Sequence, residues 1–211
     1  MKIFQISIDN FKNEYLEIAL NLLKKGEVIA FPTDTSYIIA ADTYNKEAVS
    51  KIYRIKNKPL DEPLYIIGMN KDDVLNYVID WTPLAEKLSN KFWPGALTII
   101  LNKSFKVPDY IVPNLETIGI RVPNHPISSK IIDEFGKPLT VSSANISEGP
   151  CPTTGRFVSE ELFDTELSLL LDAGKTPLSE ASTIIDLSKD KPVLIREGAI
   201  KREHLDIEDL I

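Results

Sequence analysis

Short apolar runs that alternate with amphipathic segments constrain the fold of this chain more than any other feature. The segment 10–25 carries apolar residues at helical spacing, with Asn10 in the N-cap position and Gly26 where a left-handed terminator belongs. The run 28–31 has the length and composition of a buried strand, and a turn leads from it into a second strand at 37–41. Strands that alternate with helices in this way indicate an α/β fold.

The same periodicity continues to the end of the chain. Asn45 is expected to cap a helix, Thr82 and Pro83 have the N-cap and N1 pattern of another, and the segment 127–135 is expected to form a helix that ends at Gly136. Further strands are expected at 2–8, 65–67, 97–101, 118–122, 139–141, 167–171, 183–186 and 193–196. Because the last strands are bunched, the pattern favours a mixed sheet over a fully parallel one.

The composition of the 211 residues is ordinary for a globular protein. Hydrophobic residues make up 43% of the chain and charged residues 26%, which is enough to supply an apolar core. No repeat, low-complexity segment or linker divides the sequence, so a single domain is predicted. The tail 201–211 is expected to form a solvated helix.

The net charge of −7 argues against a protein that binds nucleic acid over its whole surface, because such binding depends on the neutralisation of phosphates. It leaves room for a local basic cleft. Lys56, Lys58, Arg121 and Arg196 all stand at predicted strand or helix ends, where such a cleft could gather them.

Cysteine and histidine are too rare to build a disulfide framework or a Cys/His zinc cluster, since the chain has Cys151, His125 and His204 only. No apolar run reaches the roughly 18 residues that a membrane helix requires. The first six residues alternate like a strand and lack the long apolar region of a signal peptide. These features predict a cytoplasmic protein with no membrane partner and no protein-bound metal.

Two short polar tracts carry the chemistry. The tract 56–59 (KNKP) ends an amphipathic run with two cations, and the tract 142–145 (SSAN) follows an apolar run with hydroxyl groups and a carboxamide. Two cations brought against a row of hydroxyl and amide donors suit a polyphosphate. A lysine pair at the end of a helix also complements the helix dipole, so neither tract is specific alone.

Arg121 lies inside a β-branched strand, where an arginine must be paired or face a polar cavity. A structural salt bridge and an anion-binding role are both open. The turn 32–37 joins two apolar strands with consecutive hydrogen-bonding side chains, and a capped turn would explain it as well.

The segment 172–176 (DAGKT) follows an apolar strand but is not a P-loop. The position five residues before Gly174 is Leu169 rather than glycine, and Pro177 obstructs the helix that should begin there. A tight turn is predicted instead.

Three other residues are interpreted as structural. Gly95 is expected to supply an unusual backbone dihedral in a helix-to-strand turn. His125 is expected to be a loop residue near a helix start rather than a catalytic base. Cys151, between two prolines, has no evident base nearby and is treated as incidental.

Taken together and in order, these segments resemble the YrdC/TsaC family, the threonylcarbamoyl-AMP synthases. The resemblance runs from about residue 10 to residue 200, and its matching stretches are 26–37, 56–58 with 63–64, 92–101, 118–126, 138–154, 182–186 and 196–199. Each stretch is weakly specific alone, but the ordered set is highly specific. Longer members of the family carry a second, C-terminal domain, which a chain of 211 residues is too short to contain.

The resemblance implies one YrdC-like α/β domain over residues 1–211, with a twisted, mixed parallel and antiparallel sheet flanked by helices around a deep polar cavity. It also implies a reaction in which L-threonine, bicarbonate and ATP, with Mg²⁺, give threonylcarbamoyl-AMP and pyrophosphate. In the family, partner proteins then transfer the threonylcarbamoyl group to adenosine 37 of tRNAs.

The resemblance further implies the site residues. Those expected to bind ATP are Lys56, Lys58, Thr117, Ser143, Asn145 and Arg196. Those expected to bind threonine are Thr35, Arg121 and Ser182. Lys56, Lys58 and Arg121 are expected to carry the catalysis, because two anions must approach each other and fixed cations are the main requirement. Arg121 would hold the threonine carboxylate with both arms of its guanidinium.

Three single residues and one three-residue segment depart from the family pattern. Lys58 replaces the arginine of a Lys-x-Arg signature, and Glu62 stands where Asn or Lys is common. The segment 38–40 (IIA) replaces Gly-Leu-Gly, and Ile67 occupies a position that is often histidine. A lysine keeps the charge of the arginine but loses its planar fork.

Two alternatives remain beside the synthase. One is a related paralogue that handles another carbamoyl or acyl adenylate, which Lys58 and Glu62 suggest. The other is a noncatalytic module that binds double-stranded RNA or tRNA, against which the acidic total charge weighs.

Overall fold

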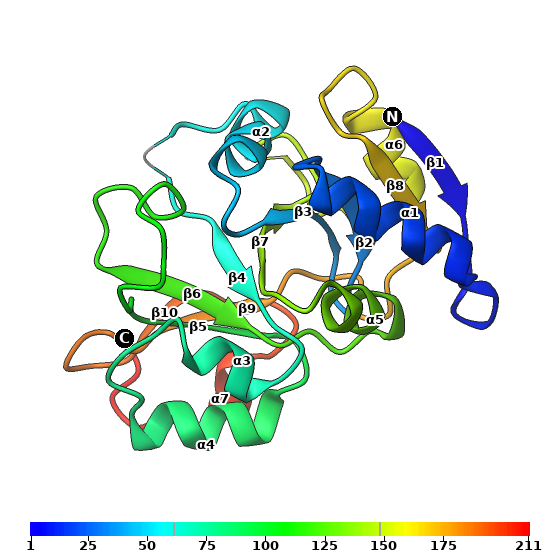
Figure 1. The fold of residues 1–211 in the computed structure, drawn as a ribbon. Helices are drawn as coiled ribbons and strands as arrows, with labels where there is room; N and C mark the ends of the chain where they lie inside the picture. Colours follow the sequence, from blue (N-terminus) through cyan, green and yellow to red (C-terminus); the bar gives the residue numbers. More distant parts are fainter. Residues whose placement is uncertain (61, 148) are drawn as a thin grey trace.

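A ten-stranded sheet runs through the part of the chain that the computed structural model describes, which is residues 1–60, 62–147 and 149–211 (Figure 1). The strands are β1 (Lys2–Gln5), β2 (Ile29–Pro32), β3 (Tyr37–Asp42), β4 (Tyr65–Ile67), β5 (Leu97–Asn102), β6 (Thr117–Arg121), β7 (Leu139–Ser143), β8 (Leu169–Asp172), β9 (Thr183–Asp186) and β10 (Val193–Arg196). The α-helices are α1 (Asn13–Lys24), α2 (Lys46–Lys56), α3 (Lys71–Leu75), α4 (Pro83–Phe92), α5 (Pro126–Phe135), α6 (Gly155–Glu161) and α7 (Arg202–Leu205).

The order of the strands is β1-β8-β2-β3-β7-β4-β6-β5-β9-β10, so strands distant in sequence lie side by side. The pairs β1–β8, β2–β8, β4–β6 and β5–β9 are parallel. The pairs β2–β3, β3–β7, β4–β7, β5–β6 and β9–β10 are antiparallel. The predicted α/β class with a mixed sheet is therefore confirmed.

The central strands are buried on both faces, which explains why they appear in the sequence as continuous apolar runs. In β2 the alternating residues Ile29 and Phe31 contribute to one core, while Ala30 contributes to the core on the opposite face. Strand β3 divides in the same way, with Ile38 in the first core and Ile39 in the second. This period of two is the one that strand geometry imposes.

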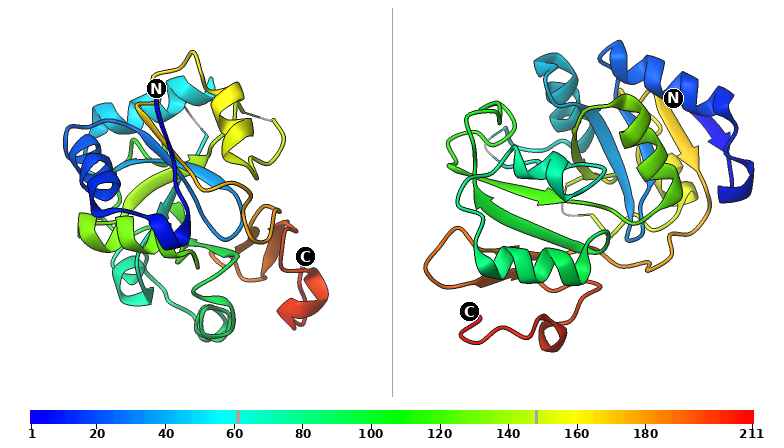
Figure 2. Two further views of the ribbon diagram at one scale, coloured as in Figure 1. Left: turned by 90° about the vertical axis from the view of Figure 1, so that its right-hand side faces the viewer. Right: turned by 60° about the horizontal axis from the view of Figure 1, so that its bottom comes forward.

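The helices cover the sheet unevenly. Helices α1 and α5 contact each other and pack over β2, and their apolar residues form one core with Ile38, Ile67 and Val141 (Figure 2). Helices α2, α4 and α6 pack against β3, β5 and β8 with side chains in the other core. The face that α1 and α5 cover continues along β4, β6 and β5, and there it carries the polar side chains described below.

Capping residues account for the helix ends. Asn45 and Thr82 accept hydrogen bonds from the backbone of Ala48 and Ala85, as predicted, and Gly136 adopts a φ of 69° at the end of α5. The prediction that Asn10 begins a helix is wrong. Ser7 instead caps a 3-10 turn, η1 (Ile8–Asn10), so that α1 begins at Asn13.

The C-terminal tail is mostly not helical. Helix α7 has four residues and ends where Asp206 adopts a φ of 51°. Its Leu205 is fully buried, so this segment is packed on the core rather than only solvated, which corrects the prediction of a solvated helix over 201–211. None of the helices in the described residues is both long enough and apolar enough to span a bilayer.

The turn after β8 is held by a buried tyrosine. The hydroxyl of Tyr37 donates to the carbonyl oxygen of Gly174 at 2.8 Å and accepts from the backbone nitrogen of Ala173 at 2.9 Å. Gly174 has a φ of 80°, so the segment is the tight turn that was predicted in place of a P-loop. Burial raises the pKa of the Tyr37 hydroxyl, which therefore stays protonated as a donor.

Removal of this hydroxyl is expected to destabilise the fold. Tyr37→Phe removes the hydrogen-bond partner of the Ala173 amide and one of the two donors to the Gly174 carbonyl, at a cost of about 1 kcal/mol in the free energy of unfolding. Denaturant titration measures it. Tyr15→Phe, which keeps the ring that stacks on Phe4 at 4.8 Å, is the control and should change the stability by less than about 0.5 kcal/mol. Equal stabilities of the two variants would contradict the prediction.

Candidate active site

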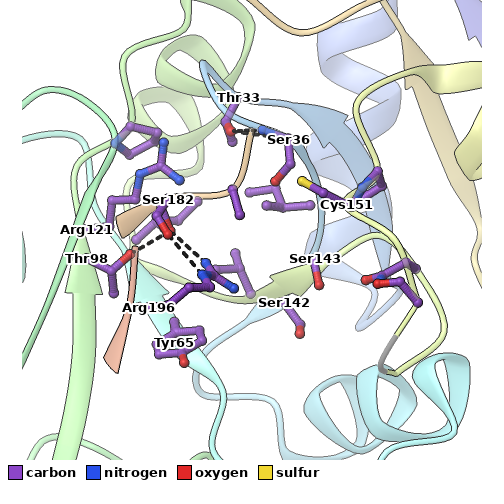
Figure 3. Close-up of a pocket in the computed structure, with 18 residues that line it drawn as sticks. Thr33, Ser36, Tyr65, Thr98, Arg121, Ser142, Ser143, Cys151, Ser182 and Arg196 are labelled. Atoms are coloured by element: carbon purple, nitrogen blue, oxygen red, sulfur yellow. Dashed lines mark hydrogen bonds between the residues drawn. The ribbon is translucent and has the colours of Figure 1, made fainter. Parts of the chain in front are cut away.

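A cavity of about 200 Å³ opens on the sheet face beyond α1 and α5 (Figure 3). A groove of about 400 Å³ adjoins it, because Tyr65, Ser142, Ser143, Asn145, Gly149 and Arg196 line both. Strands β3 to β7, the segment just before β9 and the end of β10 therefore converge on one continuous hollow. Its walls hold cations, hydroxyl groups and a patch of branched aliphatic side chains.

Arg121, the last residue of β6, is buried in the wall of the cavity. Its guanidinium donates to the carbonyl oxygen of Gly95 at 2.8 Å, to the hydroxyl of Thr35 at 2.8 Å and to a carboxylate oxygen of Asp34 at 2.6 Å. Burial lowers the pKa of Arg121, and the charge of Asp34 opposes that effect. The salt bridge that the sequence left open is therefore present. Three of the five N–H donors of a guanidinium are used, which leaves two for a ligand in the cavity.

Gly95 owes its place to a close approach rather than to an unusual dihedral. A Cβ atom at this position would lie 2.4 Å from the carbonyl oxygen of Phe92, and the φ of Gly95 is not positive. The expectation of an unusual dihedral is corrected accordingly. The tight turn brings the Gly95 carbonyl to Arg121, so the glycine helps to orient the guanidinium.

Thr35 lies behind the cavity wall. Its hydroxyl lies 3.0 Å from the hydroxyl of Thr33 and accepts a hydrogen bond from the guanidinium of Arg121, and its side chain is fully buried. The residues of this turn that line the cavity are Thr33 and Ser36, which Figure 3 shows on the strand loop above the hollow. The segment 32–37 is thus a capped turn, which was one of the two explanations offered by the sequence, and it also forms part of the site.

Ser182 and Arg196 form the opposite wall. The guanidinium of Arg196 donates to the carbonyl oxygen of Ser182 at 3.0 Å and to its hydroxyl at 3.2 Å, and the hydroxyl of Thr98 lies 3.1 Å from that of Ser182 (Figure 3). A bulge in β10 places Arg196 there, because Leu194 pairs with Ile185 while Arg196 pairs with the adjacent Ile184. In a regular strand Leu194 and Arg196 would point to the same side of the sheet. The extra residue, Ile195, makes them point to opposite sides.

The apolar part of the cavity comes from residues that the family pattern marks as unusual. Ile38 and Ile67 both line it, together with Val141. Tyr65, which sequence reasoning missed, packs its ring against Gly119, where a Cβ atom would lie 2.3 Å from the ring. A glycine inside a β-branched strand was the available signal for such a close approach.

The groove begins at the buried end of α2. The ammonium group of Lys56 donates to the carbonyl oxygens of Ser143 and Asn145 at 2.9 and 2.7 Å, and to the side-chain oxygen of Asn145 at 3.1 Å. Burial, with a smaller effect from Lys58, lowers the pKa of Lys56 to about 8. The three acceptors use all three N–H donors of the ammonium group. Lys56 therefore orients the tract that follows β7.

Lys58 has a different setting. Its ammonium group forms an ion pair with Glu62 at the rim of the groove, while Asn57, with a φ of 50°, turns the chain out of α2. Arg196 lines the groove from the other side. The structure thus brings Lys56, Lys58 and Arg196 to the groove, and Arg196 links them to Arg121 in the cavity.

Two further residues differ from the expected set. Thr117 begins β6, paired with Asn102, and is not among the described residues that line the cavity or the groove. Ser147, which sequence reasoning missed, lines the groove with a buried hydroxyl that has no hydrogen-bond partner among the described residues. A hydroxyl of this kind suits a ligand that supplies the missing partner.

The remaining residues singled out in the sequence have modest roles. His125 is the N-cap of α5, with its Nδ1 atom accepting from the backbone nitrogen of Ile127 at 3.2 Å, and burial lowers its pKa. Cys151 lies in the cavity wall with its pKa raised by burial. In the described part of the chain, no three His, Cys, Asp or Glu side chains are grouped so as to hold a metal ion.

Comparison with known proteins finds the same relatives by sequence and by structure. The threonylcarbamoyl-AMP synthase of Pyrococcus abyssi is 36% identical over 192 residues, and the match covers 90% of this chain and 56% of that protein. The Bacillus subtilis threonylcarbamoyl-AMP synthase is 37% identical, with coverages of 89% and 54%. This chain therefore spans little more than half the length of those relatives. A putative threonylcarbamoyl-AMP synthase of Methanocaldococcus jannaschii, 36% identical, is matched over 97% and 95%.

The crystal structure of P. abyssi Sua5 complexed with L-threonine superposes with a TM-score of 0.89 at 34% identity, covering 94% of this chain and 58% of that one. Escherichia coli YciO superposes with a TM-score of 0.83 at 27% identity, covering 94% and 96%. The family model that bears the name Sua5/YciO/YrdC and the description "telomere recombination" matches residues 21–198. The resemblance predicted from the ordered segments is confirmed: the chain belongs to the Sua5/YciO/YrdC family.

Proposed function

We propose that this protein is an L-threonylcarbamoyladenylate synthase, which forms threonylcarbamoyl-AMP and pyrophosphate from L-threonine, bicarbonate and ATP. One observation carries the proposal: Arg196 lines both a cavity that holds Arg121 and a groove that holds two lysines. A small amino acid and a polyphosphate could therefore lie side by side. The names of the relatives and the threonine complex of P. abyssi Sua5 support the same reaction.

The cavity suits threonine. We assign its carboxylate to the two N–H donors of Arg121 that remain after Asp34, Thr35 and Gly95 have taken three. The hydroxyl of Ser182 is within reach of the same hollow. The aliphatic wall formed by Ile38 and Ile67 offers a contact for a methyl group, which discriminates threonine from serine by roughly 1–3 kcal/mol.

The groove suits the triphosphate. Lys58 and Arg196 supply charged donors, and Ser143 and Asn145 belong to the tract that Lys56 orients. We therefore assign to Lys56 a positioning role as well as its charge. Thr117 stays a prediction from the family resemblance, because the structure does not place it in the lining of the groove.

The chemistry requires fixed positive charge. The amino group of threonine and bicarbonate give a carbamate and water, and an oxygen of the carbamate then attacks the α-phosphorus of ATP while pyrophosphate leaves. Both partners are anions, so cations on either side lower the barrier by holding them in contact. Mg²⁺ enters with ATP in this proposal, bound by the phosphates.

The wider role follows from the same reaction. Threonylcarbamoyl-AMP would be passed to partner proteins that modify adenosine 37 of tRNAs, and we place this work in the cytoplasm. The assignment of residues 1–211 to a single family domain stays a prediction.

Pyrophosphate release measured with each substrate left out in turn tests the proposed reaction. Release is expected to require ATP, threonine and bicarbonate together, because the nucleophile forms only from the last two. Undiminished release without threonine would favour the paralogue that uses another carbamoyl or acyl adenylate. Tight RNA binding without any adenylate would favour the noncatalytic module.

Arg121→Lys is expected to lower kcat/KM for threonine by about 10-fold or more, because the lysine keeps the charge beside Asp34 but loses the planar fork. Arg54→Lys is the matched control, since Arg54 binds Glu47 and Glu166 on the surface. Arg121→Met is a poorer probe, because it leaves Asp34 as an unpaired buried carboxylate at a cost of about 3 kcal/mol. A folded Arg121→Lys protein with an unchanged kcat/KM for threonine would refute the assigned role.

Lys58→Arg is expected to preserve or raise activity, since a guanidinium contacts two phosphate oxygens where an ammonium group acts as a point charge. The KM for ATP is the parameter to measure, and the KM for threonine should not change. Complete inactivation would show that the lysine itself is required.

A further inference from the structure

Glu62 brings a negative charge into the groove proposed for the polyphosphate. Among the described residues that line this groove, it is the one acid, and Lys56, Lys58 and Arg196 are the cations. A carboxylate here opposes the binding of any phosphate chain unless it has another task.

The backbone of Glu62 is fixed at the rim. Its carbonyl oxygen accepts from the hydroxyl of Tyr53 at 3.0 Å, and its nitrogen donates to the carbonyl oxygen of Pro59 at 3.2 Å. Tyr53 is a buried residue of α2, so the anchor belongs to the core of the domain. The side chain of Glu62 remains 47% exposed, so that no neighbouring group has to move for the carboxylate to turn into solvent.

The carboxylate of Glu62 pairs with Lys58, whose side chain is only 13% exposed. The other cations of the groove already have protein partners of a different kind. Lys56 donates to carbonyl and amide oxygens that hold the tract after β7, and Arg196 donates to Ser182. Lys58 is thus the cation whose present partner can leave without disturbing the fold.

We propose that Glu62 acts as an internal counter-ion, which neutralises Lys58 in the free protein and is displaced when a polyphosphate enters the groove. The inference rests on the proposed function, since it concerns the same phosphate-binding groove. A ligand that binds Lys58 must first break the ion pair, so Glu62 weakens the binding of ATP and pyrophosphate alike. The lowered affinity for pyrophosphate eases release of the product.

Calorimetric titration of Glu62→Gln with pyrophosphate, ATP and adenosine tests the inference. The affinity for pyrophosphate and for ATP is expected to rise about fivefold, the factor that loss of one exposed ion pair gives. Adenosine, which has no phosphate, should bind as it does to the natural sequence. Glu160→Gln is the matched control, because Glu160 pairs with Arg156 on the exposed face of α6.

A double-mutant cycle shows whether the effect passes through Lys58. In a Lys58→Met background the gain from Glu62→Gln is expected to fall to twofold or less, since no cation remains to be released. An undiminished gain in that background would overturn the counter-ion role and leave only general repulsion between Glu62 and phosphate.

Two other outcomes would also overturn the inference. Unchanged pyrophosphate affinity in Glu62→Gln would show that the ion pair does not compete with phosphate. Weaker binding that appears only when Mg²⁺ is present would show that Glu62 is a ligand for the metal ion instead. Failure of the proposed function has a different signature, in which pyrophosphate and ATP bind and respond to Glu62→Gln but no threonine-dependent adenylate forms. Absence of binding by every variant would overturn both.

Discussion

The ammonium group of Lys56 is the interaction on which the groove depends. A buried charge is costly unless it is fully hydrogen-bonded, and here the three acceptors come from the tract that leaves β7. The hydrogen bonds of Lys56 hold both the helix and the strand in place. The charge fixes Ser143 and Asn145, and these residues in turn keep the end of α2 against the sheet, so that helix and strand present their polar ends to one hollow.

A common principle connects the four cations of the site. Each has a protein partner in the absence of ligand: Asp34 for Arg121, Ser182 for Arg196, Glu62 for Lys58 and the tract after β7 for Lys56. Arg121 and Lys56 are buried, and their partners hold the architecture. Lys58 and Arg196 lie nearer the surface, and the proposed exchange for phosphate concerns the partner of Lys58. The two buried cations thus hold the walls of the site in place, and the two more exposed cations remain accessible to a ligand.

Much of the fold was predictable from the sequence, because its strands are buried on both faces and stand out as apolar runs between Gly, Pro and Asn. The caps at Asn45 and Thr82 were predictable for the same local reason. The start of α1 was not, because Asn10 belongs to a separate 3-10 turn and the N-cap position of α1 is Lys12, whose side chain forms no capping hydrogen bond. The partner of Arg121 was also out of reach, since Asp34 looked like an ordinary turn residue and only the crossing of strands brings it close. The sequence did not identify Tyr65 and Ser147 as residues of the site, because their place in it depends on neighbours distant in sequence.

The bulge at the outer edge of the sheet makes the pairing register of β10 matter as much as its composition. Leu194 faces the core and Arg196 faces the hollow only because Ile195 is inserted between their paired positions. If the strand paired without the bulge, with Ile195 opposite Ile184, Arg196 would lie on the same side as Leu194, and the guanidinium would leave the hollow with every charge retained. A relative that keeps the same spacing between leucine and arginine but pairs this strand without a bulge would therefore share the motif without sharing the bridge between cavity and groove.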